Sequence, residues 1–315
     1  MRESNKWVYR AGDLARDGWE TVVDSAVAGW SHTGIRVGSL QDGAELRLAA
    51  ENIERIIVPL EGSFRVMYGL RDSGETRGTV ARLQGRVSVF DGPTDVLYLG
   101  TSTAAVITGV GRIAVAEAPT TLAKPSVVIP RAGVPVELRG AGRSSRQVHN
   151  FGTPAVLDAA KLIVCEVITP AENWSSFPAH KHDENIPGHE SRLEEIYYFE
   201  SAVTRGVDAP AKADPFGMFS TYSSPVGTID INAQVRTGDV VLVPFGYHGP
   251  AAAAPGYDLY YLNVMAGPDP DRVWNISDDP AHGWIRETWE GQDVDPRLPY
   301  TPRLPNTSAP KGHGR

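Results

Sequence analysis

The chain has 315 residues, of which 41% are hydrophobic and 22% charged, and its formal net charge is −8 at pH 7. The length allows about two domains with sizeable cores, and the composition is ordinary for a globular protein. The acidic balance gives no electrostatic support for nucleic-acid binding, and a single cysteine, Cys165, excludes an intramolecular disulfide framework and a cysteine-rich zinc module.

Neither the N-terminus nor the apolar runs of the chain carry a targeting signal. The segment Met1–Trp7 lacks the apolar core of a signal peptide, and no uninterrupted apolar run approaches the length of a transmembrane helix. We therefore expect a cytoplasmic protein that binds neither nucleic acid nor a membrane.

Short apolar segments separated by turn residues fill the first part of the chain. The predicted strands are 34–37, 44–48, 56–60, 63–68, 79–83, 87–90, 95–99 and two between 104 and 115. Turn signals such as Asp42-Gly43 and Glu61-Gly62 lie between them. Strands of this length and spacing predict a sandwich or barrel and argue against a βαβ fold.

The same rhythm returns after a Pro- and Gly-rich connection at 116–142. The predicted strands are then 161–168, 174–182, 193–199, 218–222, 229–231, 240–243 and 257–265. The sequence thus predicts an all-β protein with two β-barrel domains in tandem, at 1–125 and 126–290. The Pro-rich remainder, 291–315, has little to bury and is expected to be an extended tail.

Chemistry-bearing residues gather in the second half only. His180 and His182 are one residue apart, so both face the same side of a strand. Two imidazoles that project into a barrel need partners, because burying unsatisfied polar groups is costly. These two histidines are therefore predicted metal ligands.

Further ligands come from the strands that follow. In Glu194-Glu195-Ile-Tyr-Tyr-Phe199, alternation places only one of the two acids inside the barrel. His248 follows the strand 240–243 on a turn, Pro244-Phe-Gly-Tyr, which can hold a ligand rigidly over the barrel mouth. Three imidazoles and a carboxylate suit Zn²⁺, Mn²⁺, Fe²⁺ or Ni²⁺, and residue types alone leave the choice open.

The combination resembles the two sequence motifs of the cupin superfamily, His-x-His followed by Glu and then Gly-x5-Pro-x-Gly with His. Four stretches are more specifically similar to the 5-deoxy-glucuronate isomerase family of bacterial inositol catabolism. They are Arg146–Asn150, His180–Glu184, Leu193–Tyr198 and Gly246–Gly267. The resemblance covers nearly the whole chain and is dense from about 140 to 285.

The resemblance implies a bicupin fold and conversion of 5-deoxy-D-glucuronate to 5-dehydro-2-deoxy-D-gluconate. It implies a divalent metal ion held by His180, His182, Glu195 and His248, and hence places Glu194 outside. Segment 85–93 resembles the second motif but offers no histidine, so the first barrel is expected to be structural. A metal chelated by the substrate's carbonyl and hydroxyl oxygens would stabilise an enediolate during this aldose–ketose isomerisation.

Other roles stay open at the level of sequence. Tyr247, Tyr261 and Glu194 are candidates for moving the proton. Arg146, with His149 beside it, is a candidate for binding the substrate carboxylate, because a planar guanidinium suits this group.

Alternative functions are an iron-dependent cupin dioxygenase and a non-enzymatic sugar-acid-binding bicupin. Barrel edges and an inert first domain also make a homo-oligomer plausible.

Overall fold

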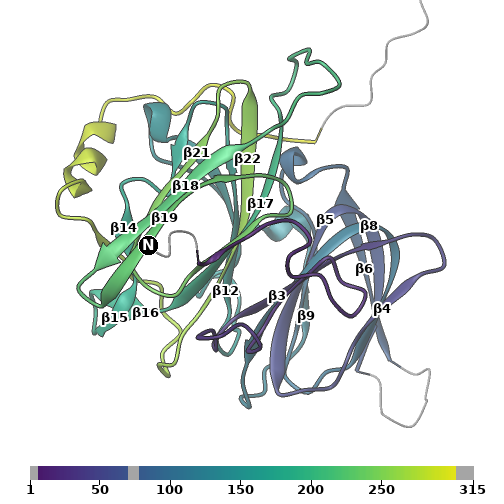
Figure 1. Ribbon diagram of the computed structural model, residues 1–315. Helices are drawn as coiled ribbons and strands as arrows, with labels where there is room; N and C mark the ends of the chain where they lie inside the picture. The colour runs from purple at the N-terminus through teal and green to yellow at the C-terminus, as the bar shows by residue number, and fades with distance from the viewer. Residues whose placement is uncertain (1–5, 70–77, 303–315) are drawn as a thin grey trace, which may run out of the picture.

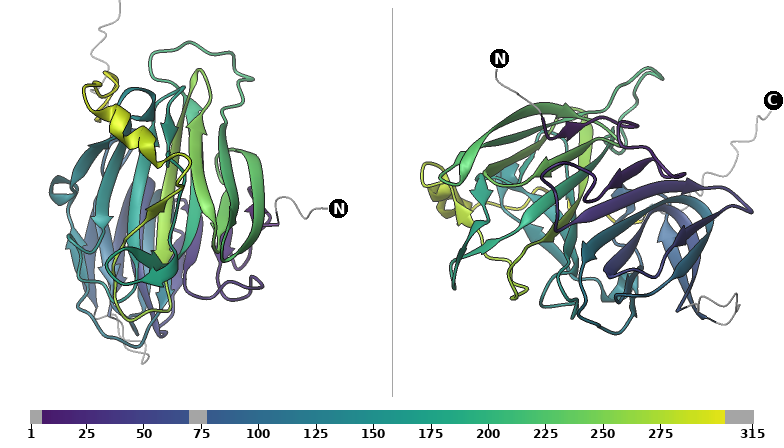
Figure 2. Two further views of the ribbon diagram at one scale, coloured as in Figure 1. Left: turned by 90° about the vertical axis from the view of Figure 1, so that its left-hand side faces the viewer. Right: turned by 60° about the horizontal axis from the view of Figure 1, so that its bottom comes forward.

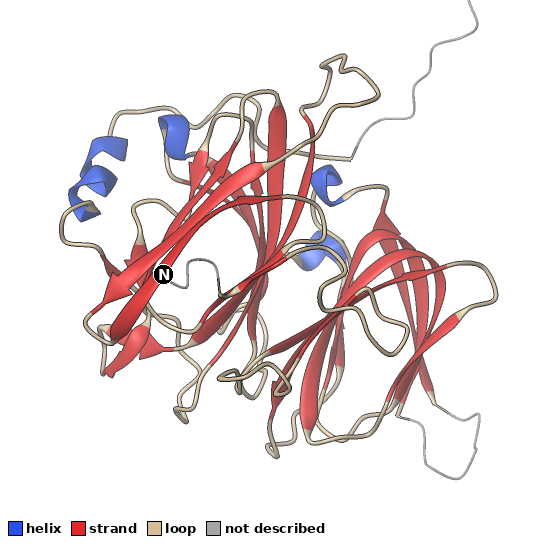
Figure 3. Cartoon of the chain, viewed as in Figure 1, coloured by secondary structure: helices blue, strands red, loops and turns tan. Residues whose placement is uncertain are grey.

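The computed structural model describes residues 6–69 and 78–302 and confirms the all-β class (Figures 1 and 3). Strands of the first barrel are β2 (Thr21–Val23), β3 (Gly34–Leu40), β4 (Glu45–Leu48), β5 (Ile53–Tyr68), β6 (Thr79–Arg86), β7 (Val96–Leu99), β8 (Ala105–Pro119) and β9 (Val127–Ile129). The 3-10 helices are η1 (Val89–Asp91), η2 (Arg131–Gly133), η3 (Gly142–Ser144) and η4 (Gly283–Trp289). No helix in the described part of the chain is long and apolar enough to cross a membrane.

Two long strands, β5 and β8, run antiparallel through the first barrel along nearly their whole length. The predicted turn at Glu61-Gly62 is wrong, because β5 continues through it with a register shift between Pro59 and Glu61. Gly62 adopts a positive φ of 85° there and lies so close to Val110 that a Cβ would collide with its carbonyl. The glycine therefore marks a bulge that bends a continuous strand.

The connections also differ from the prediction in two places. The expected strand at 87–90 is instead the short helix η1, since the Ser88 side chain accepts a hydrogen bond from the Phe90 amide and turns the chain. The expected connection at 116–142 contributes strands β9 and β10.

The second barrel consists of two facing sheets. One has the order β1-β20-β17-β22-β12-β11-β10, and the other has the order β19-β18-β21-β14-β23 with β13 paired to β21. A separate hairpin joins β15 to β16. The bounds are β1 (Val8–Tyr9), β10 (Val136–Arg139), β11 (Arg146–Gly152), β12 (Ile163–Thr169), β13 (Trp174–Ser175), β14 (His180–Lys181), β15 (Asp183–Ile186), β16 (Glu190–Arg192), β17 (Glu194–Val203), β18 (Gly217–Ser224), β19 (Gly227–Val235), β20 (Val240–Val243), β21 (Tyr247–Ala253), β22 (Tyr257–Ala266) and β23 (Ser277–Asp278).

The two barrels lie side by side (Figures 1 and 2). Each has a hydrophobic core of its own, and a further core fills the interface between them. Alternate residues of β17 and β22 divide between two clusters. Tyr197 and Tyr261 pack inside the second barrel, whereas Tyr198 and Tyr260 pack against β3, β5 and β8 of the first. Both faces of this sheet are therefore buried, which explains its nearly uninterrupted apolar runs.

A buried ion pair crosses this interface. Arg86 of the first barrel donates two hydrogen bonds of 2.7 Å to the Glu166 carboxylate of the second. Tyr260 Oη donates to the same carboxylate, and His149 Nδ1 lies 2.6 Å from it. A buried pair with this geometry ties the two barrels in one relative position.

The expected domain bounds of 1–125 and 126–290 stay a prediction. Two strands pair with strands that lie on the other side of the limit between these ranges. Strand β1 pairs with β20 of the second barrel, and β9 pairs with β7 of the first. In the expected tail, Tyr300 is buried, and its backbone exchanges hydrogen bonds with the Gln147 side chain. Residues up to 302 thus run along the protein, and 303–315 lie outside the described residues.

Candidate metal centre and adjoining cavity

Strand alternation in β17 sends the two adjacent glutamates to opposite faces. Glu195 shares the inward face with Tyr197 and Phe199, which pack in the core of the second barrel. Glu194 shares the other face with Ile196 and Tyr198, which pack in the interface between barrels. The predicted choice of the inner acid agrees with this arrangement.

Three histidines meet the inner glutamate. His180 in β14 pairs directly with His248 in β21, and His182 follows two residues after His180. One ring nitrogen from each of the three lies within 4.8 Å of the other two. Glu195 Oε2 is 3.0 Å from His182 Nε2 and 3.1 Å from His248 Nε2.

Backbone carbonyls orient the three rings. The Nδ1 atoms lie 3.1 Å from the Leu193 oxygen for His182, 3.0 Å from the Gly246 oxygen for His248 and 3.4 Å from the Pro178 oxygen for His180. A carbonyl only accepts, so a hydrogen bond to it needs a proton on Nδ1, and in a neutral ring this leaves the Nε2 lone pair for a metal ion. This is the arrangement by which proteins prepare imidazoles to bind metal ions.

Two groups of the cluster, His180 and Glu195, have pKa shifts that favour the binding of a cation. Burial and the two neighbouring imidazoles hold the pKa of His180 well below its ordinary value, so this ring is neutral. Although burial alone would raise it, contacts with His182 and His248 lower the pKa of Glu195 to about 2. Burial alone would lower the pKa of His182, but the contact with Glu195 raises it. A metal ion binds the neutral imidazole and the ionised carboxylate, so its binding would displace any proton on His182 Nε2.

His248 Nε2 provides a direct test of whether a metal ion fits. It is buried and, despite its proximity to Glu195, has no hydrogen bond with suitable geometry among the described residues. A lone pair left in this way is costly unless an electrophile accepts it. The donor set and this orphaned atom therefore suit a divalent metal ion, and several first-row ions satisfy it equally.

A second acidic group lies behind the histidines. Asp183, Glu184 and Glu190 surround Lys181 Nζ, which donates to all three at 2.6–3.0 Å. An ammonium thus neutralises these carboxylates. Lys181 turns away from the three-histidine cluster, as its position between the two histidines predicts.

Asp183 also connects two parts of the cluster. Its Oδ2 accepts hydrogen bonds from the Gly246 amide at 2.9 Å and from Ser224 Oγ at 2.6 Å. Gly246, with a φ of 103°, ends the turn that leads into β21 and His248. Asp183 therefore fixes the distance between His182, its neighbour in sequence, and the turn that precedes His248.

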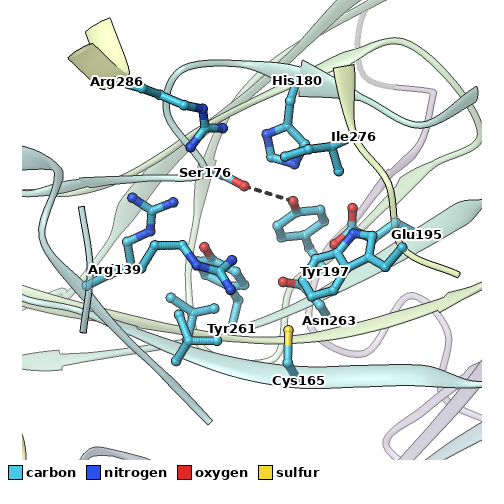
Figure 4. Close-up of a pocket in the computed structure, with 14 residues that line it drawn as sticks. Arg139, Cys165, Ser176, His180, Glu195, Tyr197, Tyr261, Asn263, Ile276 and Arg286 are labelled. Atoms are coloured by element: carbon cyan, nitrogen blue, oxygen red, sulfur yellow. Dashed lines mark hydrogen bonds between the residues drawn. The ribbon is translucent and has the colours of Figure 1, made fainter. Parts of the chain in front are cut away.

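A cavity of about 260 Å³ opens beside the cluster. Its lining residues include His180 and Glu195 at one end and Arg139, Arg146 and Arg286 at the other. Figure 4 shows Arg139 and Arg286 on the left, with His180 and Glu195 on the right. The volume is just below the range of about 300–1,000 Å³ for drug-sized ligands and therefore suits a small metabolite.

The three guanidinium groups differ in their partners. Arg139 pairs with Glu137, and Arg286 pairs with Asp278. Arg146 is 5% exposed and forms no ion pair among the described residues; it donates to the Ser144 carbonyl. Burial, together with the charges of the other two arginines, lowers the pKa of Arg146 to about 10, so it stays charged at neutral pH.

The remaining predicted site residues divide between cavity and interface. Tyr261 lines the cavity, and burial raises its pKa to about 12. Tyr247 is outside the cavity lining and stacks on Tyr222. The predictions for His149 and Glu194 need correction, since both side chains face the other barrel.

His149 is fully buried between Glu166 and Gln147 in the barrel interface. The Glu194 carboxylate accepts hydrogen bonds from the His32 and Thr33 amides, each at 2.6 Å. Neither group reaches the cavity, so neither can contact a substrate bound there.

Several cavity residues escaped the sequence interpretation. Arg139 ends β10 and lies opposite Arg146, the first residue of β11, in the hairpin that the two strands form. Residues opposite each other face the same side, so an inward-facing Arg146 could have indicated that Arg139 also faces inward. Arg286, Trp274 and Ile276 come from the segment after the last barrel strand, where no periodicity indicates which side chains turn inward. Ser176, Tyr197 and Asn263 lie within the predicted strands 174–182, 193–199 and 257–265, where alternation alone does not distinguish a cavity wall from a filled core.

Residues 7–285 match the KduI/IolB family. The chain belongs to this family. The 5-deoxy-glucuronate isomerase of Geobacillus thermodenitrificans, which this chain resembles, is 38% identical over 264 residues, covering 83% of this chain and 89% of that protein. A crystal structure of an IolB-like protein from Salmonella typhimurium is similar with a TM-score of 0.76 and 34% identity, covering 89% of this chain and 98% of that one.

A more distant structure defines the fold alone. The oxalate decarboxylase of Lactobacillus farciminis has a TM-score of 0.58 at 10% identity, covering 86% of this chain and 88% of that one. These likenesses and the two described barrels confirm the predicted bicupin architecture of this KduI/IolB family member. At that identity, the likeness carries no information about the reaction.

Proposed function

We propose that the protein is a metal-dependent aldose–ketose isomerase that converts 5-deoxy-D-glucuronate to 5-dehydro-2-deoxy-D-gluconate. One observation carries the proposal: a single small cavity has a three-histidine, one-glutamate cluster at one end and an unpaired, buried arginine at the other. A sugar acid has chemically different ends that match these two groups. The similarity to proteins named 5-deoxy-glucuronate isomerase supports the identity of the substrate.

The metal end would hold the reacting carbons. His180, His182, Glu195 and His248 are the residues that would bind the ion. When bound, a divalent ion supplies Lewis-acid polarisation of the carbonyl group beside the carbon that loses its proton. The barrel wall around Tyr197 and Tyr261 keeps this end largely away from bulk water.

The arginine end would hold the carboxylate, which the reaction leaves unchanged. Arg146 has no ion-pair partner in the part of the chain that the structure describes, and a buried guanidinium is strongly stabilised by a carboxylate with two parallel hydrogen bonds. Holding the far end in place orients the reacting end and lowers the entropic part of the barrier.

Tyr261 is the one sequence-predicted proton-transfer candidate that lines the cavity. With a pKa of about 12, its phenol keeps the proton at neutral pH. We assign it the role of a hydrogen-bond donor that can protonate a substrate oxygen, rather than the role of a base.

Metal analysis combined with an isomerase assay tests the proposal. The purified protein should contain a divalent metal ion, convert 5-deoxy-D-glucuronate to a ketose without oxygen, and lose turnover after chelation. Oxygen consumption that accompanies substrate loss would instead indicate a dioxygenase. Tight binding of the sugar acid to the metal-loaded protein without turnover would indicate a binding protein.

A further inference from the structure

Two hydrogen-bond donors in the wall of this cavity have no partner among the described residues. They are Asn263 Nδ2 and Trp274 Nε1, and both atoms are buried. The Asn263 side chain lies on the inner face of β22, with only 4% of the residue exposed. A buried donor without a partner is costly, so two in one small cavity indicate a ligand that accepts from both.

Strand register places Asn263 between the ends of the cavity. On β17, Tyr197 is opposite Asn263, whereas Glu195, two residues away, is opposite Met265 at the metal end. On β12, Tyr261 is opposite Val167, on the side toward the arginines. Asn263 is therefore one inward-facing row from the metal cluster.

Trp274 approaches from the segment that follows the barrel. Its ring lies 5.8 Å from the Arg139 guanidinium, in a cation–π contact near the arginine end. The indole N–H and the Asn263 amide thus both belong to the cavity wall, and Figure 4 shows Asn263 between Arg139 and Glu195.

The inference rests on the proposed function, because it concerns the middle of the same substrate. The carbonyl and its neighbouring hydroxyl belong at the metal end and the carboxylate at the arginines. The hydroxyl groups at carbons 3 and 4 then lie between them and take no part in the reaction. Carbon 5, next to the carboxylate, carries no hydroxyl, and the apolar Val148 and Val167 line the wall next to Arg146.

We propose that Asn263 and Trp274 are specificity-determining residues that bind the hydroxyl groups at carbons 3 and 4 of the sugar acid. Each donates a hydrogen bond to a hydroxyl oxygen, and the amide oxygen of Asn263 can accept the hydroxyl proton in return. A site built this way discriminates strongly against an analogue without the hydroxyl, because the protein donors are then left buried and unpaired.

Two variants separate this role from a structural one. Asn263→Leu replaces the amide with an apolar group of similar size, and Trp274→Phe keeps the aromatic ring but removes the N–H. A structural hydrogen bond would make either change destabilising. Because neither donor has a partner within residues 6–69 and 78–302, we expect unchanged or raised melting temperatures and a loss of about 10–100-fold in kcat/KM.

The experiment measures kcat/KM for the wild type and both variants on 5-deoxy-D-glucuronate and on analogues that also lack the hydroxyl at carbon 3 or carbon 4. The wild type should have a lower kcat/KM on each analogue than on the parent substrate. Each variant should have the same kcat/KM on the parent substrate as on the analogue without the hydroxyl that the replaced residue would bind. Trp284→Phe, at an exposed tryptophan outside the cavity lining, is the matched control and should change nothing.

Equal losses of a variant on the parent substrate and on both analogues would overturn the assignment, as would two variants with wild-type kinetics. If the wild type itself fails to convert 5-deoxy-D-glucuronate, the proposed function falls together with the assignment. An active wild type with unaffected variants refutes only the assignment.

Discussion

Glu194 and Glu195 are neighbours in sequence, yet their carboxylates serve different barrels. Glu195 Oε2 lies 3.0 Å from His182 Nε2 inside the second barrel, and Glu194 Oε1 accepts from the Thr33 amide of the first barrel at 2.6 Å. One residue of displacement along a strand thus separates a proposed metal ligand from an interdomain contact.

This relationship predicts opposite effects for two matched substitutions. Glu195→Gln should abolish turnover and weaken metal binding, because it removes the only carboxylate of the cluster while preserving size. Glu194→Ala should leave kcat within about twofold but lower the free energy of unfolding by about 1–3 kcal/mol, since buried backbone amides lose their acceptor. Denaturant unfolding and metal analysis of both variants test this, and loss of metal from Glu194→Ala would contradict it.

Arg146→Met should raise KM by about 100-fold or more, because the substrate carboxylate would lose its buried guanidinium partner. Arg146→Lys should have an intermediate effect, since the charge remains but the fork of donors is lost. Arg143→Met is the control: Arg143 is exposed and pairs with Glu172. Steady-state kinetics measure all three, and a wild-type KM for Arg146→Met would exclude this arginine from substrate binding.

Asp183→Asn should lower metal affinity by about 10–100-fold without direct contact to the ion. The substitution weakens the charge-assisted hydrogen bonds to Gly246 and Ser224 that set the turn of His248. Glu184→Gln serves as the control, because the Glu184 carboxylate is more exposed and accepts its hydrogen bond from Lys181 rather than from that turn. Competition with a chromophoric chelator reports the affinity. Equal affinities in the two variants would mean that Asp183 does not position His248.

Glu166 should make the free energy of unfolding fall at acidic pH. Burial alone would raise its pKa, but Arg86 and His149 lower it to about 2 in the folded protein. Because the folded pKa is below the unfolded one of about 4.3, the stabilisation is fully present above the unfolded pKa and is lost as pH falls toward 2. The shift corresponds to about 3 kcal/mol.

Glu166→Gln should therefore flatten the dependence of unfolding free energy on pH between about 4.5 and 2. It should also destabilise the protein at pH 7, where Arg86 keeps a buried charge without its partner. Urea unfolding at a series of pH values measures both effects. A variant with the same acid dependence as the wild type would assign that dependence to other carboxylates.

The segment after the last barrel strand shows where sequence reasoning ended. Trp274 and Ile276 reach the cavity from irregular structure and Arg286 from the short 3-10 helix η4, and in neither does a period of two or 3.6 indicate a buried face. The predicted turn at Glu61-Gly62 failed for a related reason. A glycine that ends a strand and a glycine that bends one look alike in sequence, and only the pairing of β5 with β8 distinguishes them.

The sequence by itself determined what depends on local periodicity: two sets of β-strands, the shared face of His180 and His182, and the opposite faces of Glu194 and Glu195. The tertiary structure decided what depends on chain segments distant in sequence. It brought Arg139, Arg146 and Arg286 to one end of the cavity, and it placed His149 and Glu194 in the interface between the barrels. Alternation gives a side chain its face, but only packing determines whether that face lines a cavity or meets another domain.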